Sequence, residues 1–257
     1  MSIESKFAGI KIYYSTHITF ILETVISTMQ FWGYNTTFIG DGSIKAIKDR
    51  FNPSFFRPQE SKQEKFTGNK LEKIDSQINQ KPETIKNHIL KMGLIYFFSL
   101  FEAFNKDYFQ ELYIFKPDLM KSEKRKVDLE YLLQFKDIEA LHKSLSQNQI
   151  ERFGYLDIDK FAGLILKKFN IDLKNNLECW SNLRESYYRR NNIVHNDGKI
   201  SEIYLKKLSL GNDQLNEEIN CDIEYLWKCH SNIESYMDFI DDSIRKKFNL
   251  KSCIKSL

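Results

Sequence analysis

Proline and glycine are scarce in this chain, whose 257 residues include only 4 Pro and 10 Gly. Folds built from many short strands need frequent tight turns, and those turns draw heavily on these two residues. Cysteine is also scarce, and the 4 cysteines show no disulfide framework, so we expect a cytoplasmic protein. The most apolar stretch, residues 93–104, is too short to span a bilayer and contains Ser99 and Glu102. These absences favour an all-α protein that has no membrane partner.

The composition that remains is that of a folded domain with a substantial core. Hydrophobic residues make up 42% of the chain, aromatic residues 14% and charged residues 28%. The net charge of +3 is close to neutral for this length. It neither requires nor excludes a nucleic-acid partner, because a local basic patch can be sufficient for binding.

Apolar spacing predicts helices along most of the chain. Ser15 or Thr16 can cap a helix that continues to Trp32. Residues 60–81 are polar and form either a linker or an exposed helix. Pro82 begins a helix that ends near Phe115 and is apolar on nearly all sides, as in a buried helix. Glu102 lies in the middle of that helix, where a carboxylate needs a partner.

Four more helical segments follow: residues 120–146, a helix capped by Asp157 or Asp159 that continues to Phe169, residues 177–195 and residues 221–248. We therefore expect an up-and-down helical bundle over residues 83–250. Residues 1–80 are expected to form an N-terminal helical extension and a polar linker.

The end of the helix at 177–195 is unusually polar, reading YYRRNNIVHNDG over residues 187–198. A helical wheel puts a buried stripe at Trp180, Leu183, Tyr187 and Val194, and a polar row at Arg184, Tyr188, Asn191 and His195. One interpretation is that the polar residues cap the helix, with Gly198 supplying a left-handed stop. The other is that they form a site.

The segment Arg190-Asn191-Asn192-Ile193-Val194-His195 resembles the signature of the HEPN superfamily: an arginine, a polar residue that is often asparagine, and a histidine a few positions later. Arg189 also fits a longer spacing, but Asn191 directly after Arg190 favours Arg190. The likeness extends over roughly residues 83–248 in helical context and leaves the N-terminal segment unexplained.

The resemblance implies a metal-independent endoribonuclease that cuts single-stranded RNA without a cofactor. His195 would take the proton of a ribose 2′-OH, and Arg190 would hold the phosphate. Asn191 would orient His195 or a phosphate oxygen, and Glu102 would support Arg190. Further candidates for contact with the RNA are Arg189, Tyr188 and Arg184.

The products would be a 2′,3′-cyclic phosphate and a 5′-hydroxyl. The resemblance also implies a homodimer with a composite active site, and a role as a toxin or antiphage effector under the control of an antitoxin or regulatory protein. The alternative is a non-catalytic HEPN-like module for dimerisation or for binding a nucleotide, nucleic acid or partner protein, because a fold does not by itself carry an activity.

Overall fold

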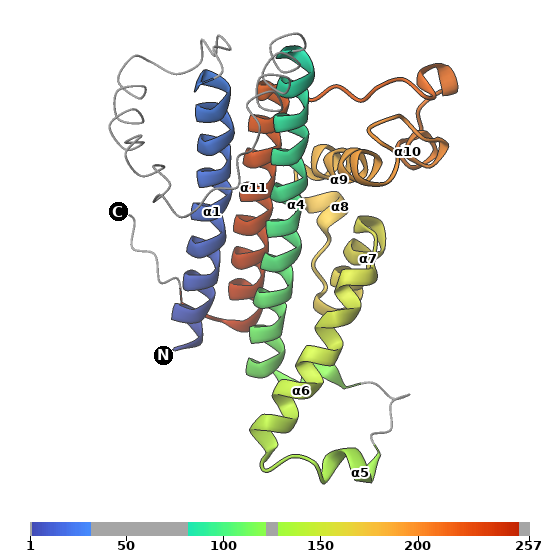
Figure 1. Cartoon of the computed structure of the whole chain (residues 1–257). Coiled ribbons are helices and arrows are strands. Elements are labelled where there is room, and N and C mark those ends of the chain that lie inside the picture. Colours follow the sequence, from blue (N-terminus) through green and yellow to red (C-terminus); the bar gives the residue numbers. More distant parts are fainter. Residues whose placement is uncertain (1, 32–81, 122–127, 252–257) are drawn as a thin grey trace, which may run out of the picture.

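Figure 1 shows the computed structural model, which describes residues 2–31, 82–121 and 128–251. Three long helices lie side by side: α1 (Ile3–Phe31), α4 (Pro82–Phe115) and α11 (Ile223–Phe248). The described ranges contain no strand, only an isolated bridge between Lys199 and Glu218. The prediction of an all-α fold is confirmed. Within the same ranges, no helix is both long enough and apolar enough to cross a membrane.

Helix α4 is the centre of the molecule and packs against α1, α11, α6 and α9. The prediction that this helix is buried is confirmed, because several of its large apolar side chains have no exposed surface: Leu94, Phe97, Phe98, Phe104 and Phe109. It begins at Pro82 and ends at Phe115, as the sequence predicts. Pro117 lies just beyond that end, and proline disfavours helical geometry in the residue before it.

Helix α1 begins at Ile3, well before the predicted cap at Ser15 or Thr16. Ser15 does not cap a helix. Its hydroxyl donates to the Glu234 carboxylate of α11 at 2.7 Å, so a serine is satisfied in mid-helix. Phe7 and Met29 are fully buried, and α1 shares one hydrophobic core with α4 and α11. The helix assigned to an N-terminal extension is thus part of the bundle core, and the predicted linker at residues 60–81 lies outside the described residues.

The segment between α4 and α9 is made of shorter pieces. They are η2 (Pro117–Met120), α5 (Leu129–Leu132), α6 (Ile138–Glu151), η3 (Arg152–Tyr155), α7 (Ile158–Phe169) and α8 (Leu173–Asn176). The predicted helix over 120–146 is therefore broken, since Asp137 caps α6 and separates it from α5. Asp157 caps α7, one of the two caps that the sequence predicts.

Helix α9 (Trp180–His195) carries the motif and packs against α4 and α11 on one flank and against α10 and α7 on another. After it come α10 (Glu202–Leu208) and the short η4 (Asn212–Gln214). Both flanks fix α9 in the molecule (Figure 1). This placement determines which motif side chains face inward.

Candidate functional site

Arg190 reaches from α9 to α4. Its Nη2 donates to the Glu102 carboxylate, and its Nη1 donates to Asn191 Oδ1 at 3.0 Å. The guanidinium carbon is 5.8 Å from the centre of the Phe98 ring and 5.6 Å from that of Tyr187. The Arg190 side chain is 13% exposed, whereas Glu102 is 43% exposed. The structure thus brings together Arg190, Asn191 and Glu102 at the edge of the helix interface.

The Arg190 guanidinium retains the capacity to bind an anion. Guanidinium carries five N–H donors, and Glu102 and Asn191 each accept from one terminal nitrogen. Arg190 Nε is buried and has no hydrogen-bond partner among the described residues. A buried donor without a partner is rare in folded proteins, so Arg190 stands out among the described polar side chains.

His195 is the last residue of α9, and its side chain is exposed. It makes no side-chain hydrogen bond to any part of the chain that the structure describes. Asn191 precedes it by four residues and so lies on the same side of the helix. Arg190 is five residues away, about 140° around the axis and about 7.5 Å along it. Arg190 and His195 therefore lie on the two sides of Asn191 around the last turns of α9.

The predicted buried stripe of α9 is correct at Trp180 and Leu183 but wrong at Val194, which is 46% exposed. The wheel assumed a single buried face. In the structure α9 is buried on two flanks, and Tyr188 and Asn192 lie in the second one. Val194 lies in line with Leu183 on the wheel, but it belongs to the last turn of the helix, where its side chain is exposed.

Asn192 shapes the turn that follows the motif. Its backbone oxygen accepts from the amides of Asn196 and Gly198 at 2.9 and 3.1 Å. Its buried side-chain Oδ1 accepts from the Ser201 amide at 3.2 Å, and Nδ2 donates to the Tyr188 carbonyl. Gly198 has a φ of +74°, so the predicted left-handed stop is confirmed. Sequence reasoning gave Asn192 no role, because it treated the motif as Arg190, Asn191 and His195.

Arg184 and Tyr188, two of the predicted RNA contacts, both bind Asp159 of α7. Arg184 Nε and Nη2 donate to the Asp159 carboxylate at 2.6 and 3.0 Å, and Tyr188 Oη donates at 2.8 Å. Burial alone would raise the pKa of Asp159, but the hydrogen bonds from Arg184 and Tyr188 and the charges of Arg184 and Lys207 lower it to about 2. These side chains join α9 to α7.

Arg189, the third predicted RNA contact, belongs to a second polar network, which joins α9 to α10 and α11. Its Nε donates to Glu185 at 2.7 Å, and its guanidinium lies 4.1 Å from the centre of the Tyr225 ring. Tyr204 and Tyr225 each donate to the Glu185 carboxylate at 2.6 Å. Burial raises the pKa of both tyrosines, so they remain protonated donors. Sequence reasoning missed Glu185, whose only signal was its spacing of four from Arg189.

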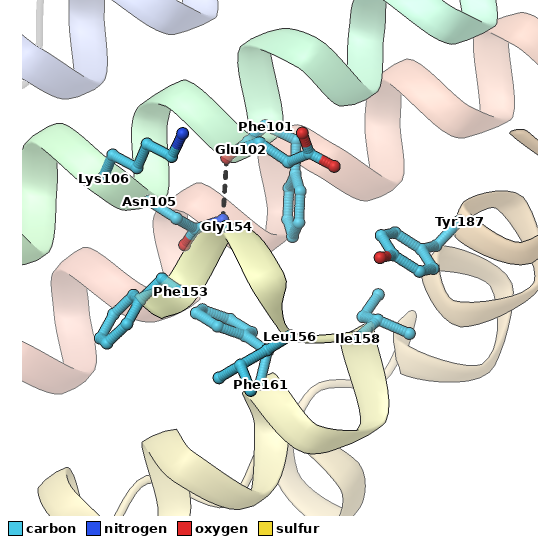
Figure 2. A pocket seen from close by; sticks show the side chains of 10 residues that line it. All are labelled: Phe101, Glu102, Asn105, Lys106, Phe153, Gly154, Leu156, Ile158, Phe161 and Tyr187. Atoms are coloured by element: carbon cyan, nitrogen blue, oxygen red, sulfur yellow. Dashed lines mark hydrogen bonds between the residues drawn. The ribbon is translucent and has the colours of Figure 1, made fainter. Parts of the chain in front are cut away.

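Two hollows border α9. Figure 2 shows the one beside Glu102, where Tyr187 of α9 faces Phe101 of α4 and Phe161 of α7. This cavity holds about 30 Å³, which is room for about one water molecule and too little for a nucleobase. A groove of about 650 Å³ lies along the flank that carries Arg184, lined also by Trp180 and Leu208.

Within the described residues, no group of three or more His, Cys, Asp or Glu side chains is placed to hold a metal ion. The geometry instead brings together Arg190, Asn191 and Glu102, with an exposed His195 five residues after Arg190 at the end of the same helix. Comparison of the chain with protein-family models, curated proteins and solved structures finds no match.

Proposed function

We propose that the protein is a metal-independent endoribonuclease that cuts single-stranded RNA. The observation that carries the proposal is that Glu102 and Asn191 hold Arg190, while His195, five residues later, is exposed at the end of the same helix. A guanidinium and an imidazole are the two groups that cleavage by the neighbouring 2′-OH needs. The sequence resemblance to HEPN ribonucleases assigns the same two residues.

In this mechanism, neutral His195 accepts the proton of a ribose 2′-OH. The 2′-oxygen then bonds to the adjacent phosphorus while the bond from phosphorus to the 5′-oxygen breaks. Arg190 stabilises the negative charge that develops on the phosphate oxygens, and its planar fork of donors suits them better than an ammonium group. The leaving 5′-oxygen takes a proton, so the products are a 2′,3′-cyclic phosphate and a 5′-hydroxyl. DNA lacks the 2′-OH and is not cut.

A second copy of the chain completes the site in this proposal. Val194 and His195 are exposed in the last turn of α9, where a second α9 can pack. The two His195 side chains then meet across the dimer axis. One acts as the base toward the 2′-OH, and the other acts as the acid toward the 5′-oxygen.

An RNase of this kind in the cytoplasm needs restraint, so the proposal includes a toxin or antiphage role with an antitoxin or regulatory protein as partner. The rival function is a non-catalytic module that binds RNA or a partner. The observation that favours the rival is the lack of any described hydrogen bond that would orient the His195 ring. An activity assay separates the two.

The test is cleavage of labelled single-stranded RNA, and separately of DNA, by purified protein in the presence of EDTA. We expect cleavage of RNA alone, with 2′,3′-cyclic phosphate ends. His195→Ala and Arg190→Ala are each expected to reduce the rate by a factor on the order of 100 or more. His17→Ala is the matched control, because His17 is also exposed but lies on α1. RNA that is bound and not cut would favour the rival, and loss of cleavage in EDTA would refute the metal-free mechanism.

Glu102→Gln tests the support given to Arg190. The amide keeps the shape and one acceptor but loses the charge, so Arg190 should be held less firmly. We expect an activity between those of wild type and Arg190→Ala, with dimerisation unchanged in size-exclusion chromatography. Wild-type activity in Glu102→Gln would show that the ion pair serves only the packing of α9 on α4.

A further inference from the structure

Four basic side chains gather around η3, at the far end of the cavity from Arg190. We call them the η3 basic patch: Lys106 of α4, Arg152 of η3, and Lys167 and Lys168 of α7. They come from three separate stretches of the chain, so the fold and not local sequence assembles them. No single run in the sequence shows this cluster.

Contacts around η3 hold the patch together. A Cβ added at Gly154 would lie 3.4 Å from Lys106 Cε and 3.5 Å from its Nζ, so the missing side chain lets Lys106 cross η3. Lys168 Nζ is 5.2 Å from the centre of the Tyr113 ring. That ring is 6.3 Å from the ring of Phe153, the neighbour of Arg152 in the chain. Lys106, Arg152 and Lys168 therefore flank the same short helix.

The positive charges of the patch are not neutralised inside the protein. None of the ion pairs between described residues involves its four members, while Asp157 is paired with Lys207 and Asp159 with Arg184. Burial and then the charges of Arg152 and Lys167 lower the pKa of Lys168, as expected for like charges held close together. Exposed Glu151 precedes Arg152 in the chain, and Glu102 lies one helical turn before Lys106, where it pairs with Arg190. The patch repels itself, and a polyanion would relieve that repulsion.

The patch is continuous with the candidate active site. Lys106 follows Glu102 by one helical turn on α4, and both line the cavity of Figure 2 together with Gly154 and Tyr187. Tyr187 in turn contacts the Arg190 guanidinium, at 5.6 Å from its ring centre. An RNA strand that extends from Arg190 past Tyr187 and the cavity would reach Lys106 and then η3.

We infer that the η3 basic patch binds the phosphate backbone of the single-stranded RNA on one side of the scissile bond. The inference rests on the proposed ribonuclease function and adds to it a path for the substrate. Spaced cations without carboxylate partners suit successive phosphates, whereas the cavity beside Glu102 is too small to select a base. The patch therefore gives affinity and not sequence preference.

The test compares a dinucleotide, which has one phosphodiester, with an RNA of about 12 nucleotides. The variant Arg152→Gln/Lys167→Gln/Lys168→Gln removes three charges outside the catalytic residues. We expect its KM for the longer RNA to rise about tenfold or more, with kcat unchanged and dinucleotide cleavage equal to wild type. The slope of log affinity against log salt should become shallower by about 2, since each phosphate contact to a single strand contributes about 0.7. Glu151→Gln should have the opposite effect and lower KM.

The control is Lys136→Gln/Lys206→Gln/Lys228→Gln, which removes the same charge from exposed lysines outside the patch. If it raises KM as much as the patch variant, or if the patch variant slows dinucleotide cleavage equally, the inference is wrong. Binding of a non-cleavable 2′-O-methyl oligonucleotide tests the patch independently of activity. If the protein proves not to be a nuclease, weaker oligonucleotide binding by the patch variant would still support the inference. If the patch variant loses binding to anionic phosphatidylserine vesicles while its oligonucleotide binding is unchanged, the inference is wrong.

Discussion

Asp159 connects the motif helix to α7, and it does so with charge. Its carboxylate accepts from Arg184 and Tyr188, while the adjacent Glu185 accepts from Tyr204 of α10 and Tyr225 of α11. A hydrogen-bonded ion pair of this kind is directional, so it fixes the rotation of α9 as well as its position. The orientation of Arg190 and His195 depends on that rotation.

Replacing Asp159 with Asn should destabilise the protein by about 1–3 kcal/mol at neutral pH, because the partly buried Arg184 loses its counter-charge. The pKa of Asp159 is lowered to about 2 from an ordinary value of 3.8. Stabilisation by a carboxylate with a depressed pKa is complete above its unfolded-state pKa and is lost as the pH falls through the folded-state pKa. The difference between wild type and Asp159→Asn should thus be constant above about pH 5 and shrink between about pH 4 and 2. Urea denaturation across this range measures it.

Asp213→Asn is the control for the pH series, since Asp213 is exposed and makes no ion pair with the described residues. Its difference from wild type should stay within about 0.5 kcal/mol at every pH. If Asp159→Asn behaves like this control, the Arg184–Asp159 pair does not hold α9 in solution.

For single residues, the sequence shows which side chains need a hydrogen-bond or ion-pair partner better than it shows which partner they bind. A carboxylate in the middle of an apolar helix predicts a buried partner, and Glu102 indeed binds Arg190. Arg184, Tyr188 and Arg189 were predicted to contact RNA because they are polar residues on the motif helix. In the structure Arg184 and Tyr188 bind Asp159 of α7, a partner that no helical wheel of α9 includes, and Arg189 binds Glu185. Whether Arg190 and His195 are catalytic stays a prediction.

Gly198 determines how α9 ends. Its φ of +74° is readily available only to glycine, and its amide bonds the Asn192 carbonyl to close the turn. Lys91 of α4, paired with Glu218 at 2.7 Å, lies against this turn. The position of His195, three residues earlier, depends on this closure.

We expect Gly198→Ala to destabilise the protein by about 1–2 kcal/mol, the usual penalty for an L-residue in left-handed geometry. A Cβ there would also lie 3.0 Å from Lys91 Nζ. Gly163→Ala should do the opposite and stabilise by about 0.5–1 kcal/mol, because that glycine lies within α7 and no atom is within 4 Å of the added Cβ. Thermal denaturation of both variants measures the contrast. A neutral Gly198→Ala would show that the turn can close in another geometry.

Helix boundaries follow the sequence where a strong local signal exists. Pro82, Asp157 and Gly198 each mark a boundary correctly, since their effect acts through the adjacent backbone. Ser15 misleads, because its hydroxyl is satisfied by Glu234 on a helix more than two hundred residues away in the chain. Local sequence gives the capping potential of a residue, and the tertiary partner decides whether it is used.

The molecule as a whole depends on α1. Phe7 stacks on Tyr108 of α4 with ring centres 4.5 Å apart, and Tyr108 donates to Asp241 of α11 at 2.7 Å. Thr19 and His230 lie within hydrogen-bonding distance across the same interface, at 3.1 Å. Helices from the two ends of the chain, α1 and α11, therefore meet α4 in one core. Such a core is expected to unfold as one unit.

Phe7→Ala should therefore destabilise the whole protein by about 3–5 kcal/mol, the usual effect of removing a fully buried phenylalanine ring. Circular dichroism and tryptophan fluorescence should report the same urea midpoint for this variant. Ile12→Ala, on the exposed side of α1, should change stability by no more than about 0.5 kcal/mol. A separate early transition in Phe7→Ala would mean that α1 folds independently, as the predicted N-terminal extension would.

The two anchored flanks of α9 leave Val194 and His195 without a part in the core. Nearly every substitution at these two positions should therefore leave cellular abundance unchanged, in contrast to Leu183 or Asn192. A saturation scan that reads abundance and activity separately would expose this difference. A loss of activity at His195 without a loss of abundance could not come from misfolding. It would measure directly how much the function depends on contacts made by this exposed side chain.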